Sequence, residues 1–188
     1  MIEQICFISH EQGRITAIQK GPVSAMEPPN NDYIEYLGDE EIGFDWYIAD
    51  GQPLKKPDQP SKYHVFNYAT GAWEYDLPVA KNVKWMDIKA ARNSEEFGTF
   101  TWSTHTFQCD ETSQRRIQGA VQLAQLDSTT TLDWTLADNS VQTFNATELQ
   151  QIGQALAAHV NACHVKSRTK REEINAATTE AALDAIIW

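Results

Sequence analysis

Histidine and cysteine are the residue types in this sequence that could bind a metal ion, and the chain has five histidines and three cysteines. His159 and Cys163 are four residues apart in a stretch with helical periodicity, so both could face one ion. A zinc site needs three or four converging ligands, and the sequence contains neither a CxxC nor an HExxH motif to supply them. Cys163 also falls on the apolar stripe of the same stretch. We therefore expect a packed cysteine, a partly exposed histidine and no metal site.

Catalysis would need a reactive group with partners placed around it. His105 and Cys109 fall on one face of a predicted strand, but no third residue is placed to orient them. Adjacent carboxylates occur at 40–41, 95–96 and 110–111, in polar surroundings typical of solvated faces or helix starts. The nine glycines form no GxGxxG motif and no phosphate-binding loop. These patterns predict no catalytic residue, no cofactor and no enzymatic activity.

The charge pattern argues against two further classes of partner. The net charge is −11 and uneven: residues 1–80 carry thirteen acidic and five basic side chains, a net of −8, against −3 for residues 81–188. Binding to nucleic acid through phosphates needs a basic stripe, and docking on an anionic membrane needs a basic surface. No apolar run approaches the roughly 20 residues that span a bilayer, and the first residues do not have the pattern of a signal peptide. We expect a protein partner.

The elements that would position these side chains begin with a β-rich segment over residues 1–78. Apolar-polar alternation and many aromatic and β-branched residues predict strands there. The predicted strands are residues 2–9, 14–20, 33–37, 45–49, 63–67 and 72–76. The first two and the last two each enclose a glycine-containing turn, which predicts two hairpins. Residues 52–62 hold three prolines and are the best candidate for a linker.

From Val79 the periodicity becomes helical. Helices are predicted over 79–97, 111–126, 146–174 and after Thr179, and hairpins over 99–109 and 131–144. The polar run from Lys166 to Glu173 either continues the long third helix or breaks it. Strands that come as hairpins between helices form antiparallel sheet. The predicted fold class is therefore α+β, with a β-rich N-terminal hairpin module (1–78) for attachment or interaction, followed by an α+β domain (79–188).

Aromatic side chains crowd into the β-rich segment between residues 33 and 75. A segment of this size is too small to bury all of them in a core of its own, and tryptophan and tyrosine are enriched at protein interfaces. A small aromatic core and a partner interface are both compatible with this pattern. The residues predicted for the interface are Tyr33, Tyr36, Trp46, Tyr47, Tyr68, Trp73 and Tyr75.

An ordered series of motifs in the second half has a more specific resemblance. The series is 98–102 (GTFTW), 107–110 (FQCD), 113–120 (SQRRIQGA), 132–140 (LDWTLADNS), 146–149 (ATEL), 174–177 (INAA) and the closing Ile187-Trp188. Over roughly residues 82–188 it resembles an uncharacterised domain family found at the C-terminus of phage and prophage tail proteins, including tail-fibre and tail-fibre-assembly-like proteins. Residues 46–51 (WYIADG) and 65–73 (VFNYATGAW) look like the small β modules of such proteins.

The resemblance implies a structural protein of the bacteriophage tail, located in the virion after synthesis in the host cytoplasm. Its partners would be other tail proteins of the fibre or baseplate, and it would be a homo-oligomer or be present in several copies on a symmetric ring. The alternative that it implies is a chaperone that binds the tail fibre during folding. Arg92, Asp110, Arg115 and Trp134 match the family pattern as structural residues, and we hypothesise that Arg115 or Arg116 pairs with Asp110.

Overall fold

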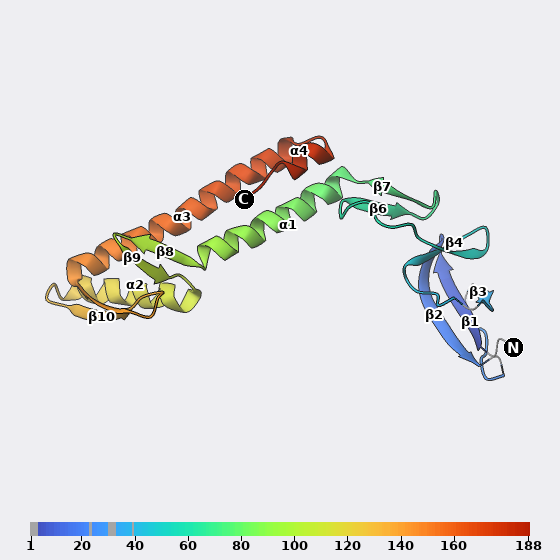
Figure 1. The fold of residues 1–188 in the computed structure, drawn as a ribbon, viewed down its shortest axis with the longest axis horizontal. Coiled ribbons are helices and arrows are strands. Elements are labelled where there is room, and N and C mark those ends of the chain that lie inside the picture. The colour runs from blue at the N-terminus through green and yellow to red at the C-terminus, as the bar shows by residue number, and fades with distance from the viewer. Residues whose placement is uncertain (1–3, 23, 30–32, 39) are drawn as a thin grey trace. The chain divides into compact units, whose positions relative to one another are not determined.

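The computed structural model describes residues 4–22, 24–29, 33–38 and 40–188, and the chain divides into two compact units, Met1–Ala80 and Lys81–Trp188. The fold is α+β, with a curled antiparallel sheet and small hairpins combined with four helices among the described residues (Figure 1). The division lies two residues after the boundary expected from the change of periodicity at residue 79.

The N-terminal unit is built around one five-stranded antiparallel sheet. Its strands are β1 (Gln4–Glu11), β2 (Arg14–Pro22), β3 (Tyr33–Tyr36), β4 (Trp46–Ala49) and β5 (Gln52–Lys55), in the order β3-β1-β2-β4-β5. Alternate side chains of β1, β2 and β4 enter one small core. The core consists of Cys6, Ile8, Ile15, Ile42, Trp46 and Ile48.

The prediction of a linker over residues 52–62 was wrong for its first four residues, whereas residues 56–62 form no helix or strand. Gln52–Lys55 form β5, which pairs with β4 along its whole length, with Pro53 opposite Ile48. Because β5 is the edge strand of the sheet, a proline can lie in it without removing an inner-sheet hydrogen bond. The next residue, Lys56, also donates its main-chain N–H to the carbonyl of Asp45.

A separate hairpin of β6 (His64–Asn67) and β7 (Ala72–Tyr75) completes the N-terminal unit, as predicted. Helix α1 (Leu77–Glu96) follows after a single residue. The Asp76 side chain accepts a hydrogen bond from the N–H of Val79, which satisfies one donor of the first turn. Pro78 also falls in this first turn, where the N–H that proline lacks would have had no helical partner.

In the C-terminal unit two long helices pack against two hairpins, and a short helix follows. The hairpins are β8 (Thr99–Trp102) with β9 (His105–Gln108) and β10 (Thr131–Thr135) with β11 (Val141–Asn145); the helices are α2 (Glu111–Leu126), α3 (Ala146–Ala176) and the short α4 (Glu180–Asp184). One apolar core joins the hairpins to α2 and α3, and its large buried side chains include Phe107, Ile117, Phe144, Leu149 and Ile152. The N–H of Ala137 donates to the carbonyl of Thr106 and ties one hairpin to the other.

Helix α3 runs without a break through the polar stretch from Lys166 to Glu173. Its start is a capping box, in which the Asn145 side chain and Glu148 satisfy each other's main-chain donors. Its second half lies against α1, because Lys166 forms an ion pair with Glu95 and Arg171 stacks on Trp85 at 4.8 Å. These contacts with α1 stabilise the helix through this polar segment, for which the sequence allowed either a continued or a broken helix.

Candidate protein-binding site

The structure gathers part of the predicted aromatic interface around one buried ring. Tyr47, Tyr68 and Trp73 surround Phe66 edge-on, with ring centroids 4.9, 5.1 and 5.2 Å from it. Lys56 lies over the Phe66 and Tyr68 rings at 5.3 and 4.9 Å and donates to the Tyr68 hydroxyl. All three outer rings are half-buried in these contacts. The cluster is therefore in large part the small aromatic core of the N-terminal unit.

The remaining predicted interface residues lie elsewhere in the same unit. Tyr33 packs edge-on against Phe7 at 5.1 Å, and Tyr36 packs against the sheet core. Tyr75 contacts the ring of His64. Trp46 is only 7% exposed and belongs to that core, so placing it at a partner interface was wrong. An alternating strand puts every second side chain inside, and Trp46 has the inward register together with Ile48.

The residues considered for a metal site or for nucleophilic catalysis are held in contacts within the fold. The ring nitrogen Nε2 of His159 is 3.1 Å from the carbonyl oxygen of Glu95, and Cys163 is buried. Burial raises the pKa of the Cys163 thiol and raises that of Cys109 to about 11, which disfavours the thiolate that a metal or a nucleophilic reaction requires. Within the described parts of the chain, no group of three histidine, cysteine or carboxylate residues is placed to hold a metal ion.

Glu95 is the centre of a polar cluster that the sequence did not indicate. Its carboxylate accepts hydrogen bonds from Lys166 of α3 at 3.0 Å and from the indole N–H of Trp188, the last residue. Lys166 also lies 4.2 Å from the centre of the Trp188 ring. The Lys166 ammonium, followed by the Trp188 indole, holds the pKa of Glu95 below its ordinary value. The cluster fastens the end of the chain to α1 and α3, which is a structural role.

The four residues that match the family pattern are dispersed. Arg92 pairs with Glu96 one turn later at 3.7 Å, and Trp134 packs against Phe107 at the edge of the core. The hypothesis of an ion pair between Asp110 and Arg115 or Arg116 was wrong: neither arginine is within ion-pair distance of it in the described structure. The Asp110 carboxylate instead caps α2, accepting from the N–H groups of Thr112 and Ser113 and from the Ser113 hydroxyl. The orphan donors of a helix start compete better for a preceding carboxylate than an exposed arginine does.

The cap at Asp110 makes the stability of the C-terminal unit depend on pH in the acid range. The hydrogen bonds from Ser113 hold the pKa of Asp110 below the ordinary value of 3.8. Because the folded-state pKa is depressed, this stabilisation is complete above the unfolded pKa and is lost as the pH falls through the folded one. We expect Asp110→Ala to lower the Tm at pH 7, and the difference from wild type to shrink steadily below about pH 4. Thermal unfolding followed by circular dichroism tests this, with Glu172→Ala, an exposed carboxylate of α3 outside any cap, as the control. An unchanged difference at pH 2 would contradict it.

A hollow with a volume of about 670 Å³ lies between α2 and α3 in the C-terminal unit. Its floor is apolar and consists of Ile117, Val121, Gly153, Leu156, Ala157 and Val160. Its walls are six glutamines: Gln114, Gln118, Gln122, Gln125, Gln150 and Gln154. We call this hollow the amide groove. None of its twelve lining residues is charged, although 22% of the residues in the chain are.

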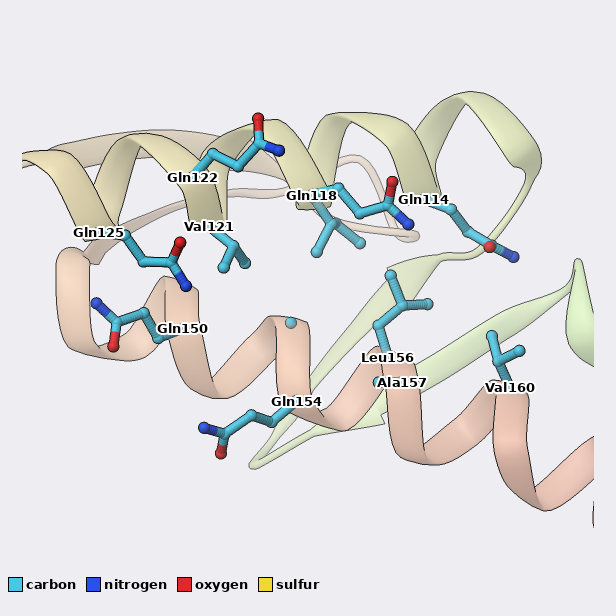
Figure 2. A pocket seen from close by; sticks show the side chains of 12 residues that line it. Gln114, Gln118, Val121, Gln122, Gln125, Gln150, Gln154, Leu156, Ala157 and Val160 are labelled. Atoms are coloured by element: carbon cyan, nitrogen blue, oxygen red, sulfur yellow. The ribbon is translucent and has the colours of Figure 1, made fainter.

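The side chains of the amide groove are arranged along its length (Figure 2). Gln114 lies near one end, and Gln125 and Gln150 face each other at the other, while Val121 and Leu156 lie between the helices. Gln150 donates to the carbonyl of Ala124, and Gln114 donates to that of Cys109, so both ends are held in place. No hydrogen bond to the described part of the chain occupies the other four amides, which remain available to a ligand.

The groove was missed by the sequence reasoning, although a signal was present. Gln114, Gln118, Gln122 and Gln125 recur at three- and four-residue spacing, which places them on one face of a helix. Glutamine is a common polar residue on helix surfaces, so the row alone indicates only a solvated face. Only the packing of α3 alongside α2 turns that face into a wall.

An uncharged groove with an apolar floor on an α+β domain has the features of a ligand- or protein-binding surface. Residues 79–187 match the family described as a domain of unknown function, DUF4376, and the chain belongs to this family. The match spans all of α2, α3 and the groove between them. No curated protein and no solved structure matches the chain.

Among the helices of the described residues, none is long and apolar enough to cross a bilayer.

Proposed function

We propose that this protein is a non-enzymatic structural component of a bacteriophage tail that acts by binding other tail proteins of the fibre or baseplate. The ordered motifs between residues 98 and 188, which resemble the C-terminal domains of phage and prophage tail proteins, suggest this setting. In this proposal the protein is part of the virion and is present in several copies, as a homo-oligomer or on a symmetric ring.

The observation that best supports a binding role is the amide groove. Its volume of about 670 Å³ is within the range of about 300–1,000 Å³ for ligand sites. Its lining offers no acid, base or nucleophile, but it does offer hydrogen-bonding amides above an apolar floor. Such a surface can bind a partner but has no group to transfer a proton or attack a bond.

Additional support comes from the surface next to the groove. Leu126 follows Gln118 and Gln122 at four-residue spacing on the same face of α2 and is 86% exposed. Burial of so exposed a leucine under a partner favours the complex, because apolar surface is removed from water. Together with the amide groove it makes this face of α2 the preferred surface for a protein partner.

Quantitative mass spectrometry of purified phage particles tests the proposal. The protein should be present in the mature particle in a fixed ratio to a known tail protein, with copies in multiples of three or six. A host cytoplasmic protein of similar abundance in the lysate serves as the control for carry-over. Absence from the particle, with recovery on immature fibres in the lysate, would contradict the structural role and support a chaperone of fibre folding.

A further inference from the structure

We propose that the amide groove binds an extended, uncharged segment of a partner protein by hydrogen bonds to that segment's main chain. This inference deepens the proposed function, on which it rests for the kind of partner. It concerns Gln118, Gln122, Gln125 and Gln154, whose amides make no hydrogen bond within the described structure. The four side chains are long and exposed, so each can rotate toward a ligand without rearranging the fold.

The chemistry of the lining selects the occupant. Each primary amide has two donors and an acceptor, which is the complement of a peptide unit with its one N–H and one C=O. A charged segment would lose hydration without gaining a counter-charge, because no lining residue carries one. An uncharged segment avoids this cost. In a protein with a net charge of −11, this surface can accept a neutral chain without repelling it.

The spacing of the amides matches an extended chain. Gln118 and Gln122 are four residues apart, which corresponds to about 6 Å along a helix. An extended chain repeats its main-chain orientation every two residues, about 6.6–6.8 Å. From Gln118 to Gln125 the free amides of α2 cover about 10 Å, the length of about three extended residues. Successive peptide units of one strand can therefore meet successive amides of α2.

Alternate side chains of such a segment would lie against the apolar floor of the groove. An extended chain turns every second side chain to the same side, and here that side faces Val121, Gly153 and Ala157. These residues are apolar, so the floor offers an uncharged surface on which those side chains can lie. A helical occupant fits less well. Its main-chain N–H and C=O groups are already bonded to each other, which would leave the four amides without main-chain partners.

An NMR titration of the full-length, 15N-labelled protein tests the proposal. The probe is a capped, uncharged seven-residue peptide of sequence TATVTAT. Because the recognised group is the main chain, the probe does not need the natural sequence. We expect saturable shifts in the low-millimolar range for the side-chain NH2 signals of Gln118 and Gln125 and the main-chain signals of Gly153 and Ala157. The same peptide with alternate nitrogens methylated should bind at least tenfold more weakly, because its donors are removed.

Two double variants separate recognition from folding. Gln118→Ala with Gln125→Ala should weaken binding about tenfold or more, while Gln142→Ala with Gln151→Ala, two exposed glutamines outside the groove, should leave it unchanged. The proposal is overturned if shifts do not saturate, lie outside the groove, or persist in the first variant. It is also overturned if groove signals shift on dilution without peptide, because a second copy of the chain would then be the occupant. None of these outcomes depends on whether the protein is found in phage particles.

Discussion

Phe107→Ala should cost about 3–5 kcal/mol of unfolding free energy, the range for removing a large aromatic side chain from a packed core. Phe107 has no exposed surface, and its ring stacks on Phe100 at 5.2 Å and contacts Phe144 at 5.6 Å. Residues from β8, β9, β11 and both long helices of the core meet around it. The alanine variant would leave a cavity that these elements cannot fill without separating from one another.

Urea unfolding followed by far-UV circular dichroism measures this effect, because nearly all helical residues belong to the C-terminal unit. A total stability of about 5–15 kcal/mol is usual for a domain, so the variant should unfold at a much lower urea concentration. Leu126→Ala is the matched control: that side chain is 86% exposed, and its truncation should change the stability by less than about 0.5 kcal/mol. Equal midpoints for the two variants would show that Phe107 is not at the centre of the core.

Alanine at Gly153 and alanine at Gly119 should change the stability in opposite directions, although both glycines lie inside helices. A Cβ added at Gly153 would lie 2.5 Å from Cγ2 of Val121, whereas one at Gly119 would meet nothing within 4 Å. Alanine stabilises a helix by about 1 kcal/mol relative to glycine, whereas overpacking destabilises a fold by about 1–3 kcal/mol. Val121 is β-branched and stiff in a helix, so it cannot turn aside easily. We expect Gly119→Ala to gain up to about 1 kcal/mol and Gly153→Ala to lose about 1–2 kcal/mol.

The same urea unfolding experiment resolves this difference, and a double-mutant cycle identifies its cause. Combining Gly153→Ala with Val121→Ala removes the methyl group that causes the collision, so the pair should lose less than the sum of the two single variants. Additive losses would mean that α2 and α3 do not meet at these two residues. The result bears directly on the amide groove, because the contact of Val121 with Gly153 sets how closely its two walls approach.

Most helices and strands of this fold were predictable from local pattern. The hairpin of β1 and β2, the helices α2 and α3 and the two hairpins between the helices all lie close to their predicted residues. The exceptions have identifiable causes. The prolines in 52–62 indicated a linker, but an edge strand tolerates Pro53. Pro78 occupies the first turn of α1, so the helix begins at Leu77, two residues before its predicted start.

The candidate site was much less predictable than the elements that form it. The aromatic residues between 33 and 75 were visible, but composition does not distinguish an interface from a small core. Burial of Trp46 and the packing of three rings around Phe66 show that the core has a large share of them. The arginine partner expected for Asp110 was not found, because its carboxylate caps α2 instead.

Local patterns in the sequence are sufficient for the α+β class, the order of the elements and the acidic, uneven charge, because periodicity and turn residues act over a few positions of the chain. The tertiary structure alone decided which faces meet. The amide groove needs Gln118 and Gln154, which are 36 positions apart in the sequence, on the walls of one hollow. The Glu95 cluster joins residues from α1, α3 and the end of the chain. Such distant partners are selected by the burial of apolar faces, which no local pattern specifies.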